Sequence, residues 1–184
     1  MKKIIIVALV LLAVGGGVLY VLYIYSATTV NPAAEVPHTV YTPSVESGGE
    51  NGSEYRNTAF GFALDYPKEL QVREYQEANS ALSVVFEDPD DGRGLQVYVT
   101  PYGDTQITDE RFKADQPSGV MQEPTDVLVS GARATMFFGR NEAMGDTREV
   151  WFIHNGFLYE VATYKALDAW FAEIMQTWKF LSND

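Results

Sequence analysis

Three aspartates that precede a glycine form the densest set of candidate metal ligands in the chain. Asp88, Asp90 and Asp91 lie directly before Gly92, and calcium favours several carboxylate oxygens gathered on a tight turn. The spacing departs from that of an EF-hand loop, in which a carboxylate would stand at the position of Val99. The run therefore predicts a solvated acidic turn, and its alternative is a weak calcium site formed by Asp88, Asp90 and Asp91.

The histidine in the second half of the chain is the candidate general base. His154 lies beside Asn155-Gly156, but the chain lacks a Gly-x-Ser-x-Gly elbow, a His-Glu-x-x-His zinc motif and a phosphate-binding glycine loop. Because the chain has 25 Asp and Glu residues, paired carboxylates are a second route to hydrolysis. We expect no enzyme activity and no cofactor, and a hydrolase that uses His154 or paired carboxylates is the alternative.

The charge of the chain narrows the classes of partner. The net charge is -12, and -11 of it falls in residues 57–184, where ten Lys and Arg stand against 21 Asp and Glu. A surface of that sign repels phosphate backbones and anionic lipid headgroups, so we expect no nucleic acid ligand. The chain also has no cysteine, which excludes disulfides, thiolate nucleophiles and a lipidated cysteine. Cations and basic proteins are the favoured partners.

An uncharged apolar run that begins at Ile4 and ends at Tyr25 predicts a membrane span. As a helix it would extend roughly 33 Å, enough to cross a hydrocarbon core of about 30 Å. Two lysines precede the run and three tyrosines lie near its end, a pattern that places the amino terminus in the cytoplasm. We expect residues 1–25 to be a signal anchor in the cell membrane, with an extracytoplasmic carboxy-terminal domain. The alternative is a cleaved signal peptide.

The rest of the chain divides into a linker and one domain. Residues 26–56 contain three prolines and a Ser- and Gly-rich run without a period of 2 or 3.6, which predicts a flexible linker. Residues 57–184 remain for a single globular domain, a length close to the commonest domain size.

Alternating apolar residues predict several strands in this domain. Phe60, Phe62, Leu64 and Tyr66 alternate with smaller or polar residues, which is the pattern of a strand with one buried face. Further strands are expected at 71–75, 81–87, 94–100, 126–130 and 132–139. The strands on either side of the aspartate run are expected to pair as a hairpin.

Asn155-Gly156 is the strongest local signal in the domain, because this dipeptide suits the positive φ angles of a type I′ turn. It predicts a hairpin in which His154 faces Phe157 and Val150 faces Val161. Large apolar side chains fall on both faces of this hairpin. We therefore expect it at the centre of the sheet, covered on both sides.

Two helices are expected to flank the sheet. Thr108 and the acidic residues after it are typical of a helix start, and Pro117 would end that helix early. A second helix is indicated by an amphipathic stripe. The stripe comprises Leu167, Trp170, Phe171, Ile174 and Trp178. The order of elements predicts an α+β fold with a mainly antiparallel sheet of about six to eight strands flanked by helices.

Two stretches that bracket the domain resemble the PsbP-like domain family. Residues 60–67, Phe-Gly-Phe-Ala-Leu-Asp-Tyr-Pro, resemble the opening and the Tyr-Pro close of that family's first strand. Residues 174–180, Ile-Met-Gln-Thr-Trp-Lys-Phe, are similar to its closing helix. The resemblance implies an antiparallel sheet sandwiched by helices, in an extracytoplasmic accessory domain that binds proteins rather than catalysing reactions.

Together these patterns predict a membrane-anchored extracytoplasmic binding or scaffolding module that contacts a protein partner near the outer membrane face. Two alternatives stay open at this point. One is the extracytoplasmic hydrolase with His154 or paired carboxylates, and the other is a calcium-binding module that uses the turn at Asp88, Asp90 and Asp91.

Overall fold

The computed structural model of the chain describes residues 7–14, 17–24, 52–142 and 144–181. Mainly antiparallel strands and two α-helices make up this part of the chain, which confirms the α+β class. The strands are β1 (Val7–Val14), β2 (Gly17–Ile24), β3 (Gly52–Asn57), β4 (Phe62–Pro67), β5 (Gln71–Gln76), β6 (Leu82–Glu87), β7 (Gly94–Pro101), β8 (Gln122–Val129), β9 (Ala132–Asn141), β10 (Gly145–His154), β11 (Phe157–Tyr164) and β12 (Lys179–Phe180). The helices are α1 (Asp109–Asp115) and α2 (Asp168–Met175), with short 3-10 turns at Ala78–Ser80 and Lys165–Leu167.

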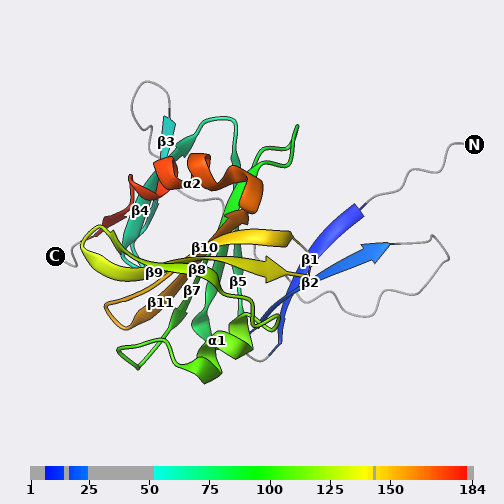
Figure 1. Cartoon of the computed structure of the whole chain (residues 1–184). Coiled ribbons are helices and arrows are strands. Elements are labelled where there is room, and N and C mark those ends of the chain that lie inside the picture. Colours follow the sequence, from blue (N-terminus) through cyan, green and yellow to red (C-terminus); the bar gives the residue numbers. More distant parts are fainter. Residues whose placement is uncertain (1–6, 15–16, 25–51, 143, 182–184) are drawn as a thin grey trace, which may run out of the picture.

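A seven-stranded antiparallel sheet forms the middle layer, in the order β5-β6-β7-β11-β10-β9-β8. One of its faces packs against α2 and a three-stranded sheet of order β12-β4-β3. The other face is covered by α1, whose Phe112 contacts the rings of Phe137 and Trp151. Figure 1 shows α2 and β4 on one side of the layer and α1 on the other. We call the face that α1 covers the α1 face.

The hairpin of β10 and β11 lies in the middle of this sheet, as predicted. His154 pairs with Phe157 and Val150 with Val161, so the expected register is confirmed. Asn155 and Gly156 have φ angles of 47° and 79°, the positive values that a type I′ turn requires. The hairpin of β6 and β7 around the aspartate run is also confirmed.

The main core lies between the seven-stranded sheet and the three-stranded one. Phe62 and Trp178 stack with ring centroids 4.7 Å apart and planes 5° apart, and Phe152 stacks on Tyr159 at 5.0 Å. Tyr55 on β3 is 1% exposed and packs edge-on to Phe86 at 5.3 Å. Burial of large aromatic side chains is the main favourable contribution of this layer.

The start of the domain differs from the sequence prediction. The predicted linker ended at residue 56, yet Gly52–Asn57 pairs with Phe62–Pro67 as β3. The boundary was wrong because a single buried aromatic, Tyr55, holds this strand on the core without a longer apolar pattern. Residues 26–51 of the predicted linker lie outside the described residues.

Both helices form where they were predicted, but their ends differ from the prediction. The Thr108 side chain caps α1 by accepting from the backbone N–H of Arg111 at 3.1 Å. Helix α2 ends at Met175, so Trp178 lies beyond the helix. Its side chain is still buried in the main core, with 3% exposed. The Thr177 hydroxyl donates to the Ile174 carbonyl at 2.7 Å and accepts from the Asp65 amide at 2.9 Å, which turns the chain from the helix into β12.

The amino-terminal segment also differs from its prediction. Where a helix was expected from Ile4 to Tyr25, Val7–Val14 pairs with Gly17–Ile24 as an antiparallel hairpin. Valine, isoleucine and tyrosine favour strands, so the same composition suits a pair of strands. Within the described residues, no helix is long and apolar enough to span a membrane. Residues 4–6, 15–16 and 25 lie outside them, and the membrane anchor stays a prediction.

Candidate functional site

The aspartates predicted as calcium ligands close a turn between β6 and β7. The backbone N–H of Asp88 donates to the Arg93 carbonyl at 2.8 Å. Asp88 Oδ1 accepts from the amide of Asp90 at 2.9 Å, and Asp91 Oδ1 accepts from the amide of Arg93 at 2.8 Å. Two of the three carboxylates therefore stabilise the turn that carries them.

Arg93 supplies the positive charge of this turn. Its Nη2 lies 3.0 Å from Glu69 Oε1 and 3.5 Å from Asp88 Oδ2, and its guanidinium lies over the Trp170 ring at 5.6 Å. Among the described residues no group of three or more His, Asp or Glu is placed to hold a metal ion. Calcium binding by Asp88, Asp90 and Asp91 stays a prediction.

His154 lies at the margin of the main core. Its ring stacks on Phe180, with centroids 3.6 Å apart and planes 19° apart. Burial lowers the pKa of His154, which favours the neutral ring. The stacking contact with Phe180 gives His154 a role in packing.

The α1 face carries a buried acidic cluster that no sequence motif pointed to. Asp115 at the end of α1, Glu149 on β10 and Glu160 on β11 are 9%, 5% and 7% exposed. Arg111, one turn before Asp115, donates from Nε to Asp115 Oδ2. Arg111 Nη2 lies 3.6 Å from Glu160 Oε1. Carboxylates of this kind are rarely buried unless paired.

Asp115 and Glu160 interact directly through a side-chain hydrogen bond. Burial raises the pKa of Glu160 well above its usual value, and the neighbouring Asp115 carboxylate raises it further. Burial also raises the pKa of Asp115, although the hydrogen bond from Glu160 and the Arg111 charge oppose that shift. These directions favour a protonated Glu160 that donates to an ionised Asp115.

Glu149 is held by a separate set of donors. Its Oε1 accepts from the Thr147 hydroxyl at 2.7 Å and from Gln116 Nε2 at 3.5 Å, and its Oε2 accepts from Trp151 Nε1 at 3.2 Å. Burial raises the pKa of Glu149, and these three hydrogen bonds oppose the shift. The side chain of Gln116 can pass close to β9 because Gly139 has no side chain. A Cβ at position 139 would lie 2.6 Å from Gln116 Nε2.

These groups enclose a small cavity of about 40 Å³, which we call the acid chamber. The buried polar groups in its lining include Asp115, Glu149, Glu160 and Tyr98. Asp115 Oδ1, Glu160 Oε1 and Arg111 Nη2 are buried without a hydrogen-bond partner. Buried polar atoms normally have partners, and Arg111 Nη2 and Glu160 Oε1 face each other as an ion pair at 3.6 Å.

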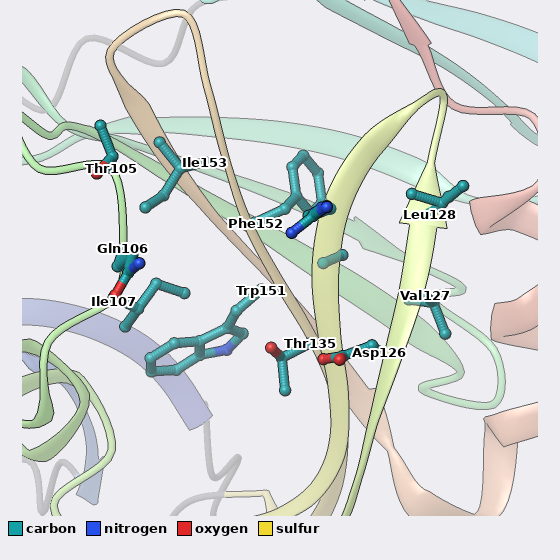
Figure 2. Close-up of a pocket in the computed structure, with 12 residues that line it drawn as sticks. Thr105, Gln106, Ile107, Asp126, Val127, Leu128, Thr135, Trp151, Phe152 and Ile153 are labelled. Carbon is teal, nitrogen blue, oxygen red and sulfur yellow. The ribbon is translucent and has the colours of Figure 1, made fainter.

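A larger recess of about 1130 Å³, which we call the groove, lies on the same face beside the chamber. Ile107, Trp151 and Ile153 line one side, and Asp126, Leu128 and Thr135 come from β8 and β9. Figure 2 shows β8 and β9 across the groove from Ile107 and Ile153, with the Trp151 ring below these two isoleucines. Trp151 lines both hollows, so it is the partition between them.

The comparisons with known proteins concern the fold. Neither the family models nor the curated proteins match this chain. Among solved structures, this chain is similar to the solution structure of cyanobacterial PsbP (CyanoP) from Synechocystis sp. PCC 6803. The match covers 72% of this chain and 94% of the CyanoP chain. The TM-score is 0.54 and the sequence identity is 15%. The likeness confirms the PsbP-like α+β architecture that the two bracketing stretches predicted.

Proposed function

We propose that the chain is a membrane-anchored, extracytoplasmic binding module whose groove receives an extended segment of a protein partner, without catalysis. The groove is the observation that carries this proposal, with apolar Ile107, Trp151 and Ile153 opposite Leu128, which is 72% exposed. Apolar recesses with a few polar groups are the usual form of binding sites. The PsbP-like fold supports an accessory or binding role.

The partner segment is expected to combine basic and apolar side chains. Asp126 and Arg133 both line the groove, so the preference for a basic segment rests on the surrounding domain, which carries most of the net charge of -12. Complementary charge would steer a basic segment toward this face and fix its register. Apolar side chains of the segment would cover Leu128 and Ile153.

Addition of a partner strand to the edge of the sheet is the competing mode of binding. Strand β8 ends the seven-stranded sheet, but its pairing with β9 is irregular between Gln122 and Thr125. Pro124 lies within this irregularity, and Glu123 has a φ angle of 52°. Prolines and bulges discourage strand addition, which favours the groove over the β8 edge.

The hydrolase alternative gains little support from the site. The paired carboxylates of Asp115 and Glu160 line a chamber of about 40 Å³, whereas pockets for drug-sized ligands are about 300 Å³ or larger. His154 packs on Phe180.

Site-directed photo-crosslinking in native membranes tests the groove. A photo-reactive residue in place of Gln106, which is exposed and lines the groove, is expected to give a discrete adduct with another protein. The same residue in place of exposed Ser118, outside the groove lining, is the control. Leu128→Asp should abolish the Gln106 adduct, whereas Met121→Asp, at a side chain 39% exposed outside that lining, should not. Equal adducts from both positions would contradict the proposal.

The anchor is tested separately by membrane extraction and by mass measurement. An anchored chain is expected to stay in the membrane fraction after an alkaline wash and to keep its amino-terminal segment. Loss of residues 1–34 from the mature protein would instead support the cleaved alternative and a soluble domain.

A further inference from the structure

The groove carries one anion and one cation that have no partner of their own. Asp126 on β8 and Arg133 on β9 both line it, and both are exposed. Among the described residues neither side chain forms an ion pair, whether with the other or with a third group. By contrast Arg140, on the same strand as Arg133, pairs with Asp146 at 2.7 Å. Two charges of opposite sign are therefore available to a ligand of the groove.

The register of β8 and β9 sets the spacing of these two charges. Asp126 stands opposite Thr135. Arg133 stands opposite Leu128, which lies two residues further along β8 than Asp126. Because directly opposite residues of an antiparallel pair share a face, Asp126 and Arg133 point to the same face. They are separated by a step of two residues along the strands, or about 6.8 Å.

The opposite side of the groove is apolar. Ile107, Trp151 and Ile153 line it, and Figure 2 shows β8 and β9 across from the two isoleucines. Strands that pack on a sheet usually lie within about 30° of its own strands. Successive side chains of an extended chain point in opposite directions. A segment lying along the groove would therefore turn one row of side chains to the two charges and the other row to the apolar side.

We propose that the groove selects an extended partner segment in which a basic and an acidic residue stand two positions apart, with apolar residues before, between and after them. The basic side chain pairs with Asp126 and the acidic one with Arg133, because both spacings are one step of two extended residues. The net charge of the domain attracts basic partners at long range, whereas this pair of charges decides which segment fits. The selection rests on the proposed function, since it concerns the same groove.

Binding of short peptides to the full-length chain in a mild detergent tests the spacing. The matching probe is acetyl-Leu-Lys-Leu-Glu-Leu-amide. Its isomer acetyl-Leu-Lys-Glu-Leu-Leu-amide has the same composition and charge, but its adjacent charges point to opposite sides of an extended chain. The isomer can therefore satisfy only one of the two groove residues. With binding to the detergent alone subtracted, the matching probe should bind about two to five times more tightly, the gain from one exposed ion pair.

Charge reversal tests each contact separately. Wild type should prefer the matching probe to acetyl-Leu-Lys-Leu-Lys-Leu-amide, and Arg133→Glu should reverse this preference. Asp126→Lys should likewise bind acetyl-Leu-Glu-Leu-Glu-Leu-amide most tightly. Arg140→Glu changes the net charge by the same amount as Arg133→Glu, on the same strand but outside the groove lining, and should leave the order of the probes unchanged.

Four results would overturn the proposal. They are equal binding of the matching probe and its isomer, tightest binding of the two-lysine probe by the wild type, an unchanged order in both reversal variants, and no binding of any probe. Photo-crosslinking from Gln106 separates this proposal from the proposed function. A Gln106 adduct without peptide selection would refute the charge selection and leave the partner groove standing. Peptide selection without an adduct would support the charge selection and refute the partner groove.

Discussion

Trp151 Nε1 donates a hydrogen bond to Glu149 Oε2 over 3.2 Å. The indole ring is 3% exposed and lines both the groove and the acid chamber. One side chain therefore forms a wall of the recess and orients a carboxylate of the chamber. A ligand that moves the indole from the groove side would weaken this hydrogen bond on the chamber side.

Trp151→Phe is expected to destabilise the domain by about 1–3 kcal/mol, because it leaves a buried carboxylate oxygen without its donor. The pKa of Glu149 should rise further, since the indole hydrogen bond opposes the effect of burial. Urea unfolding of the wild type, Trp151→Phe, Glu149→Gln and the double variant measures the coupling. Additive losses would mean that the hydrogen bond does not contribute.

Glu160 makes the stability of the domain depend on pH. Its pKa is raised well above the reference value of 4.5 by burial and by Asp115, so the folded state holds a proton that the unfolded state has lost. This contribution is fully present below pH 4.5 and is lost as the pH rises toward the folded pKa. Stability should therefore fall with increasing pH in that window.

Glu160→Gln should flatten this fall, because the amide donates to Asp115 at any pH. Chemical denaturation across the window, with Glu142→Gln as the exposed control, measures the difference. Asp115 and Glu149 also have raised pKa values, so a shallower slope of the same sign should remain. A slope identical to that of the wild type would show that Glu160 is not the main titrating group.

The parts of this fold that could be predicted from the sequence are local. The register of β10 and β11 follows from Asn155-Gly156, because a two-residue turn leaves one way to pair the strands. The pairing of β6 with β7 follows in the same way from alternating apolar residues around the turn at Asp88. Aromatic residues after Leu167 indicated a helix that covers the sheet, but turn formation at Thr177 ended it before Trp178.

The acid chamber could not be predicted, because its groups meet only through tertiary packing. Asp115 and Glu160 lie far apart in the chain and come together when Phe112 docks α1 onto Phe137 and Trp151. One signal was present in the sequence, since Glu160 stands opposite Trp151 in a hairpin expected to be covered on both faces. A charged residue at such a position implies a buried partner, but no pattern identifies Asp115 as that partner.

Gly94 allows β7 to pass close to the backbone of β6. A Cβ at this position would lie 2.2 Å from the Phe86 carbonyl oxygen, which a side-chain rotation cannot relieve. Gly94→Ala should destabilise the domain by about 1–3 kcal/mol or more, the range for overpacking in a dense core. Gly103→Ala is the matched control, because a Cβ there meets nothing within 4 Å. Equal thermal unfolding temperatures for the two variants would contradict this account.

Tyr55 decides where the folded domain begins. Its ring is 1% exposed against Phe62 and Phe86, and its hydroxyl donates to Glu74 Oε1 at 2.7 Å. The same hydroxyl accepts from Asn57 Nδ2 at 3.0 Å, so Tyr55→Phe removes two hydrogen bonds and should cost about 1–3 kcal/mol, at about 0.5–1.5 kcal/mol for each. Tyr55→Ala should cost about 3–5 kcal/mol, as for other large core truncations.

The same strand predicts the result of shortening the chain. A chain that starts at Gly52 keeps β3 and its pairing with β4, and should unfold at the same urea concentration as a chain that starts at residue 26. A chain that starts at Thr58 lacks Tyr55 and exposes Phe62 and Phe86, so it should lose at least as much stability as Tyr55→Ala. If the chain starting at Thr58 were as stable as the one starting at Gly52, β3 would belong to the linker, and the burial of Tyr55 would contribute nothing to folding.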